Sequence, residues 1–299
     1  MEDVNFKGLG IALVTPFKKD RSIDFHAFEK LIHELMEGGC DYFVVLGTTA
    51  ETPTLTPREK AEVSKFVKDT VGGRLPLVIG IGGNNTYGIV DDIQTRDLEG
   101  YSAILSVAPF YNKPTQEGLF LHFKTISEAS PLPIILYNVP SRTGVNISAE
   151  TTLRLAEFSP KFCGIKEASG DLKQSEKIIK GAPEGFSLIS GNDGDTFNLM
   201  KMGAAGVISV LGNAFPRKMK RLVDLCSEGR VTEAGECQES LAKIIKYLFE
   251  DGNPAGVKAV LHRMGMMENV LRLPLVPVSR HNEENLIAEM QTLLSHASF

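Results

Sequence analysis

The sequence contains no tryptophan and only four cysteines in 299 residues, Cys40, Cys163, Cys226 and Cys237. The cysteines lie far apart and form no C-x-x-C pair, which excludes a dense disulfide framework and the common cysteine-based zinc and redox motifs. The chain opens with MEDVNFKGLG, which lacks the charged and apolar regions of a secretory signal. We therefore expect a reduced, cytoplasmic protein.

Long apolar runs and an excess of basic residues are also missing. Every apolar run is strand-sized, far below the roughly 20 residues that cross a bilayer, so no membrane span is expected. The net charge of −5 argues against a nucleic-acid partner, because such proteins carry a basic face. The histidines form no H-E-x-x-H motif and no cluster at strand ends, so no metal site is expected. They are His26, His33, His122, His262, His281 and His296.

Eight apolar, β-branched runs alternate with amphipathic helical stretches, which is typical of βα units around a parallel sheet. The runs show no polar alternation, as expected for strands that are buried on both faces. We predict an α/β fold of the (β/α)8 TIM barrel type, whose usual size is about 250 residues, and keep an open doubly wound sheet as the alternative. The predicted strands span residues 10–17, 42–47, 76–82, 103–109, 133–140, 162–169, 186–193 and 206–213.

Helical patterns fill the gaps between these runs. Apolar residues recur at helical spacing in residues 24–39, and residues 56–59 read T-P-R-E, a capping box with proline at the first helical position. From about residue 215 only helical patterns remain, and one of them completes the barrel. We therefore predict a catalytic barrel over residues 1–230 and a C-terminal helical extension over residues 231–299, which is broken near residue 251.

Catalytic side chains of a TIM barrel project from the C-terminal ends of the strands and from the loops that follow them. In this sequence, residues with reactive or binding potential gather at those ends. The candidates are Thr48 and Thr49 after the second strand, Tyr111 after the fourth, Tyr137 and Arg142 at the fifth, Lys166 on the sixth, and Gly191, Asn192 and Asp193 at the seventh.

Lys166 lies within an apolar strand, where an ammonium group must be paired or must lose its proton. Because desolvation favours the neutral amine, Lys166 is a candidate nucleophile that forms a Schiff base with a carbonyl. Tyr137 on the neighbouring strand can shuttle protons for this amine, and a threonine hydroxyl can extend a relay toward Tyr111 or solvent. The planar guanidinium of Arg142 suits a carboxylate, so the implied substrate is a carbonyl acid.

Each candidate also has a purely structural interpretation. Lys166 could pair with Glu167 or Asp171, and Tyr137 could be a core aromatic with a satisfied hydroxyl. The two threonines are also good strand-to-loop residues, and the arginine could be a solvated loop charge. The G-I-G-G-N-N stretch is no phosphate loop, because Asn85 stands where G-x-G-x-x-G requires its third glycine.

At these residues the sequence resembles the Schiff-base aldolases and lyases of the dihydrodipicolinate synthase and N-acetylneuraminate lyase family. The resemblance covers nearly the whole chain and rests on G-T-T-A-E at 47–51, Y-N-V-P-S-R-T-G at 137–144 and the strand around Lys166. One departure is Ala50, where the family usually has glycine, and alanine resists a positive φ. The threonine pair and the arginine resemble the synthases, because the neuraminate lyases usually carry Ser-Thr and lack that arginine.

The resemblance implies a lyase that condenses pyruvate with L-aspartate 4-semialdehyde to give 4-hydroxy-tetrahydrodipicolinate, in diaminopimelate and lysine biosynthesis. Lys166 would form an imine with pyruvate, Tyr137 would transfer protons, and Thr48 would relay them toward Tyr111. Because the imine is itself the electron sink, no cofactor is implied.

The resemblance also assigns binding roles and an assembly. Tyr111 would reach into the site of a neighbouring subunit, which implies an even-numbered homo-oligomer, typically a tetramer built as a dimer of dimers. The binding residues would be Thr49 at the carboxylate of pyruvate, Arg142 at the carboxylate of the semialdehyde or at the entrance, and Gly191, Asn192 and Ile208 along the site.

Two other functions stay open. A pyruvate-dependent aldolase that acts on a sugar acid or a hydroxyproline-derived acid would keep the same lysine and tyrosine, so only substrate panels separate it from the synthase. A catalytically silent barrel with a binding or regulatory role would be expected to lose Lys166 or Tyr137, and both are present.

The resemblance also predicts how the chain responds to lysine, which inhibits many bacterial and plant synthases of the family. Lys60, Gly88 and Phe110 stand where the responsive enzymes tend to have a histidine, a glutamate and a tyrosine, and Asn84 alone is retained. An added cation, a missing carboxylate and a lost phenol all disfavour a cationic amino acid. We therefore expect weak or absent inhibition.

Overall fold

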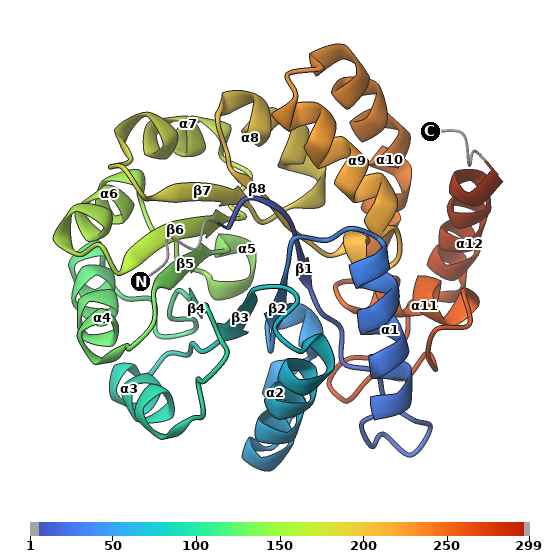
Figure 1. The fold of residues 1–299 in the computed structure, drawn as a ribbon, viewed down its shortest axis with the longest axis horizontal. Coiled ribbons are helices and arrows are strands. Elements are labelled where there is room, and N and C mark those ends of the chain that lie inside the picture. The colour runs from blue at the N-terminus through green and yellow to red at the C-terminus, as the bar shows by residue number, and fades with distance from the viewer. Residues whose placement is uncertain (1–5, 296–299) are drawn as a thin grey trace.

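The computed structural model describes residues 6–295 and contains a closed barrel of eight parallel strands. Each strand pairs with the next and β8 pairs with β1, so the sheet has no open edge (Figure 1). This confirms the predicted TIM barrel, and the open-sheet alternative is wrong. The strands are β1 (Gly8–Ala12), β2 (Tyr42–Val45), β3 (Leu77–Gly80), β4 (Ala103–Val107), β5 (Ile134–Asn138), β6 (Phe162–Glu167), β7 (Ser187–Ser190) and β8 (Gly206–Ser209).

Every strand predicted from the sequence is present, but each predicted run extends past the observed C-terminal end of its strand. At β2, β7 and β8 the chain turns into short 3-10 helices, η1 (Thr48–Ala50), η3 (Asp193–Asp195) and η4 (Leu211–Asn213). These turns contain buried residues, Leu211 among them, so they continue the apolar pattern that marks the strands. Periodicity cannot separate a buried strand from the buried turn that follows it.

Helices surround the strands and are capped by residues close in sequence (Figure 1). The Asp24 carboxylate accepts the Ala27 N–H at 3.1 Å at the start of α1. The predicted capping box between Thr56 and Glu59 is confirmed at the start of α2. The helices up to the end of the barrel are α1 (Phe25–Glu37), α2 (Pro57–Val71), α3 (Thr86–Thr95), α4 (Gln116–Ala129), α5 (Pro140–Thr143), α6 (Ala149–Phe158), α7 (Leu172–Gly181), α8 (Thr196–Met202) and α9 (Pro216–Ser227), and a short 3-10 helix, η2 (Thr52–Thr54), precedes α2.

The apolar core has two layers. The larger cluster packs between the outer faces of the strands and the helices, as the double burial of the strands predicts. A smaller cluster fills the barrel interior and includes Val44, Val78 and Ile135. The ring of Phe6 packs edge-on against Tyr42 at a centroid distance of 5.4 Å, near the N-terminal ends of the strands. The interior is therefore a packed core, which leaves the C-terminal ends of the strands for chemistry.

Three further helices follow the barrel: α10 (Val231–Glu250), α11 (Ala255–Arg263) and α12 (Arg280–Ser295). Figure 1 shows them along one side of the barrel, and the predicted break near residue 251 is confirmed between α10 and α11. The start of α10 coincides with the predicted boundary at residue 231, which stays a prediction. Within residues 6–295, no helix combines the length and apolar character needed to cross a membrane. Residues 1–5 and 296–299, which include His296, lie outside the described part.

Candidate active site

Lys166 and Tyr137 lie side by side inside the barrel. The two residues are register partners on the neighbouring parallel strands β6 and β5. The Lys166 amine lies 4.4 Å from the centroid of the Tyr137 ring. Their exposed fractions are only 5% and 6%, so the pair is largely shielded from water. A shielded amine beside a phenol is the arrangement that Schiff-base chemistry with proton transfer requires.

Glu167 and Asp171, the structural partners considered for Lys166, are engaged elsewhere. Successive strand residues point to opposite faces, so the Glu167 side chain leaves the barrel interior. Its carboxylate accepts the Asn138 side-chain amide at 3.0 Å, the Ser169 N–H at 2.7 Å and the Gln174 side-chain amide at 3.1 Å. The Asp171 side chain caps α7. In the described part of the chain, neither carboxylate forms an ion pair with Lys166.

Asn138 and Glu167 tie β5 to β6 directly behind the Tyr137–Lys166 pair. They are the next register partners along the two strands. The Asn138 side-chain oxygen also accepts the Ile147 N–H at 2.9 Å, which fixes the orientation of its amide. The register that brings Tyr137 to Lys166 is therefore secured by a buried polar network on the other face of the sheet.

The two candidate threonines lie on the turn of residues 47–51, which we call the threonine turn. It follows β2 and contains η1. Thr49 is 2% exposed, and its hydroxyl oxygen accepts the side-chain amide of Asn253 at 3.0 Å. Ala50 has helical geometry within η1, and the positive φ angles fall on Leu46 and Glu51. Alanine at the position of the usual glycine is therefore accommodated without strain.

Gly191 and Asn192 directly follow β7, and Ile208 lies on the neighbouring strand β8. A Cβ at Gly191 would lie 2.7 Å from the Cβ of Ala168, so this position requires glycine. The Asn192 side chain donates to Asp195 at 2.9 Å, and Ile208 is fully buried in the interior cluster.

Tyr111 and Arg142 lie on the surface rather than in the barrel interior. Tyr111 has a φ of 73° and is 88% exposed, and its backbone N–H is bonded to the Thr143 carbonyl. Arg142 lies on α5, in the loop after β5, and is also exposed. A non-glycine residue keeps a positive φ only where its surroundings hold it. The loop therefore holds Tyr111 with its side chain directed away from the core of its own chain.

Residues 5–293 match the sequence profile of the Dihydrodipicolinate synthetase family. The chain belongs to this family. A relative from Parabacteroides distasonis, named 4-hydroxy-tetrahydrodipicolinate synthase, is 53% identical over 277 residues, which cover 93% of this chain and 93% of that protein. A relative of the same name from Phocaeicola vulgatus is 47% identical and covers 98% of this chain and 99% of its own.

Solved structures of the family have the same fold. The dihydrodipicolinate synthase from Thermotoga maritima superposes with a TM-score of 0.94 at 40% identity, covering 96% of this chain and 98% of that one. A monomeric dihydrodipicolinate synthase variant gives a TM-score of 0.94 at 40% identity, covering 97% of each chain. The family resemblance read from the sequence is therefore confirmed.

Asp193, which follows β7, was named from the sequence as a strand-end residue without an assigned role, and it is buried near Lys166. Its carboxylate accepts the Ser209 hydroxyl at 2.5 Å and the backbone N–H groups of Val210 and Leu211. Burial raises the pKa of Asp193, while these hydrogen bonds and the charge of Lys166 oppose the rise. The S-G-N-D run that ends β7 is the only sequence signal for it.

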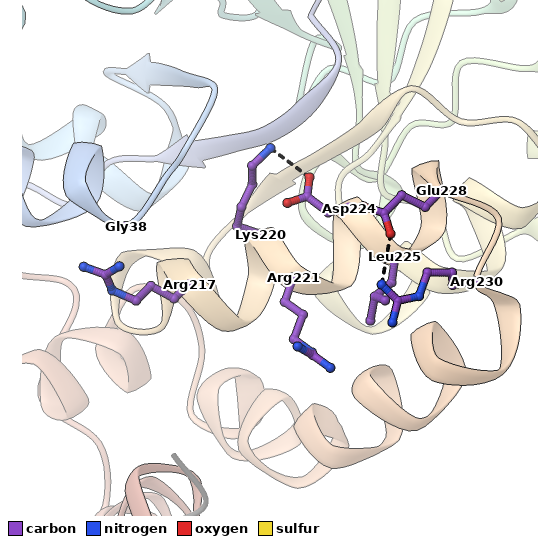
Figure 2. Close-up of a pocket in the computed structure, with 8 residues that line it drawn as sticks. All are labelled: Gly38, Arg217, Lys220, Arg221, Asp224, Leu225, Glu228 and Arg230. Carbon is purple, nitrogen blue, oxygen red and sulfur yellow. Dashed lines mark hydrogen bonds and ion pairs between the residues drawn. The ribbon is translucent and has the colours of Figure 1, made fainter. Parts of the chain in front are cut away.

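No metal centre was found among the described residues, and a pocket on the surface beside α9 lies away from this site. Among the described residues, no group of three or more His, Cys, Asp or Glu side chains could hold a metal ion. A surface pocket of about 440 Å³ lies beside α9, and its lining mixes basic side chains such as Arg217 and Arg221 with the acidic Glu228. Figure 2 shows these side chains along the helix. Lys220 in this pocket pairs with Asp224 at 2.9 Å. None of the lining residues is a candidate site residue, so the pocket is separate from the barrel mouth.

Proposed function

We propose that the chain is a lyase that condenses pyruvate with L-aspartate 4-semialdehyde to give 4-hydroxy-tetrahydrodipicolinate, in diaminopimelate and lysine biosynthesis. The observation that carries this proposal is the position of Tyr137 beside Lys166, with the amine 4.4 Å from the ring centroid inside the barrel. A nucleophilic amine and an acid–base hydroxyl must meet in this way. The names of the relatives support the same reaction.

The reaction begins with imine formation on Lys166. The neutral amine attacks the keto carbon of pyruvate, and the resulting carbinolamine loses water to give the imine. The Tyr137 hydroxyl donates and accepts the protons that these steps require. Thr48 relays protons from Tyr137 toward Tyr111, which the partner subunit supplies.

The imine then becomes a carbon nucleophile. Loss of a proton from the methyl group of the pyruvate imine gives an enamine, and its carbon attacks the aldehyde carbon of the second substrate. The amino group of that substrate adds to the imine carbon, closes the ring and releases the Lys166 amine. The balance is one pyruvate and one semialdehyde giving one product and one water. We propose that no cofactor takes part, because the imine accepts the electron pair.

The remaining candidates bind and orient the substrates. Thr49 holds the pyruvate carboxylate with its backbone N–H and its hydroxyl. Arg142, on the exposed loop after β5, attracts the carboxylate of the semialdehyde or steadies the entrance. Gly191, Asn192 and Ile208 line the site on the side of β7 and β8.

We propose that the active form is a homotetramer, a dimer of dimers. The support is Tyr111, which is 88% exposed and held at positive φ, so that its phenol is presented to another chain. We also propose that residues 1–230 form the catalytic barrel and residues 231–299 the extension. The four cysteines are free, as suits the reducing cytoplasm where we place the protein.

The experiment that tests this function is an acceptor panel. The purified protein receives pyruvate with aspartate semialdehyde, with N-acetylmannosamine or with another sugar-derived aldehyde, and initial rates are compared as kcat/KM. The proposal predicts that aspartate semialdehyde is the fastest acceptor by a wide margin. Faster turnover of a sugar aldehyde would overturn it in favour of the sugar-acid aldolase.

A further inference from the structure

A fully buried lysine in the C-terminal extension takes no part in the mechanism above. Lys258 on α11 has 0% of its surface exposed and is one of the largest fully buried side chains. Its ammonium forms an ion pair with Glu51, and both side chains are 0% exposed. The ammonium also donates to the Val270 carbonyl at 3.1 Å and lies 4.2 Å over the Phe17 ring. A buried charge is tolerated only with such a complete set of partners.

Glu51 is the last residue of the threonine turn. Its φ of 55° and ψ of 33° are left-handed, and its N–H bonds to the Thr48 carbonyl at 3.1 Å. A left-handed backbone is strained for a non-glycine residue and persists only where its surroundings fix it. Here the Glu51 carboxylate is fixed by Lys258 and by the Arg272 N–H, at 2.9 Å. Both contacts come from the C-terminal extension.

A second contact reaches the threonine turn from the same direction. Asn253, between α10 and α11, donates its side-chain amide to the hydroxyl oxygen of Thr49 at 3.0 Å, and both residues are buried. A hydroxyl that accepts a hydrogen bond in this way can direct its own proton elsewhere. Asn253 therefore leaves the Thr49 proton available for a carboxylate.

We propose that Asn253 and Lys258 are positioning residues for pyruvate. Asn253 sets the direction of the Thr49 hydroxyl, and Lys258 holds the end of the threonine turn through Glu51. The extension is thereby part of the pyruvate site although none of its residues touches the reacting atoms. The effect of the two residues on pyruvate binding rests on the proposed function, whereas their role in holding the threonine turn does not depend on it.

The test compares Asn253→Ala with a matched control, Asn282→Ala. Asn282 is also a buried asparagine of the extension, but its amide donates to the Tyr247 carbonyl at 3.1 Å and to Asp251, not to the threonine turn. Loss of the hydrogen bond to Thr49 should raise the KM for pyruvate roughly tenfold. The KM for the aldehyde and kcat should change less than about twofold, because the lost contact acts on bound pyruvate alone. The control should leave both KM values unchanged.

A second measurement does not depend on substrate. Hydrogen–deuterium exchange at the Ala50 and Glu51 amides, which bond within the turn, should accelerate about tenfold or more in Asn253→Ala and in Lys258→Met, and stay unchanged in Asn282→Ala. If Lys258→Met fails to fold, the double variant Lys258→Met/Glu51→Gln removes the unpaired charge, and Asn253→Ala keeps the ion pair intact.

The outcomes separate this proposal from the proposed function. Unchanged exchange at the turn in Asn253→Ala and in the Lys258 variants would overturn the positioning roles. An equal rise of both KM values in Asn253→Ala and Asn282→Ala would overturn them as well, because it would indicate general weakening. A wild-type protein that forms no imine with pyruvate would refute the proposed function, while the exchange rates would still decide whether the extension holds the turn.

Discussion

Replacing Glu167 by glutamine tests the network that fixes the register of Tyr137 and Lys166. The Asn138 amide lies 3.2 Å from one carboxylate oxygen and 3.0 Å from the other. The first oxygen also accepts the Ser169 N–H, and the second accepts the Gln174 amide. In either orientation, the new NH2 group of Glu167→Gln faces two N–H donors.

The expected loss of stability follows from those contacts. A hydrogen bond to a charged group contributes about 1.5–3 kcal/mol, and at least two of the contacts are lost at a position that is 2% exposed. The lost hydrogen bonds share one side chain, so their energies do not add. We therefore expect the free energy of unfolding to fall by roughly 3 kcal/mol rather than by the full sum. The neighbouring pair should also lose its alignment, so kcat should fall.

The assay is urea denaturation at fixed protein concentration, with Glu176→Gln as the control. Glu176 lies on the neighbouring α7 and pairs with Lys180 at the surface, where its side chain is 49% exposed. The same substitution should leave the free energy of unfolding almost unchanged there, because an exposed ion pair contributes little. A Glu167→Gln protein as stable as the control would refute the reasoning that this network carries the register.

Tyr137→Phe should lower kcat by a factor of roughly 10²–10⁴ and keep the fold. The control Tyr101→Phe removes a buried hydroxyl that donates to the Ser64 carbonyl, so it should lower stability and leave kcat unchanged. An unaltered rate for Tyr137→Phe would assign that residue to packing. Burial lowers the pKa of His122 from 6.5 to about 4, so the unfolded state binds a proton at a higher pH than the folded state does. The stability that the neutral, buried His122 contributes is therefore fully present above pH 6.5 and is lost as the pH falls from 6.5 through 4. His122→Asn should therefore reduce the acid-induced loss of unfolding free energy in that window by at most about 3 kcal/mol, and identical pH curves for variant and wild type would contradict this. Titration of lysine against initial rate should show weak or no inhibition, because Gly88 and Lys60 disfavour a cation, and strong saturable inhibition below millimolar lysine would show the opposite.

The barrel could be predicted from the sequence because each βα unit repeats the same local signals. The capping box at Thr56 and the unbroken apolar runs are such signals, and eight repeats indicate the closed fold. The strand ends were placed too far along the chain. Buried turns such as η4 are apolar for the same reason as the strands they follow, so composition does not mark the boundary.

The site was predictable only where its residues share a strand end or a recognisable motif. Lys166 and Tyr137 stand out because a charged or phenolic side chain interrupts an apolar run. The contact of Lys258 with Glu51 joins residues 207 positions apart, and no local pattern reports it. In retrospect, Lys258 interrupts the apolar A-G-V-K-A-V-L stretch as Lys166 interrupts its strand, so the same signal was present twice.

The most direct test of the central claim is to trap the imine. The protein is incubated with pyruvate, reduced with borohydride and digested, and the modified peptide is located by mass spectrometry, with Lys166→Arg as the control because arginine cannot supply a neutral amine. We predict one reduced pyruvate adduct per chain, on Lys166, and none in the control. An adduct on another lysine, or no adduct in the wild-type protein, would contradict the account.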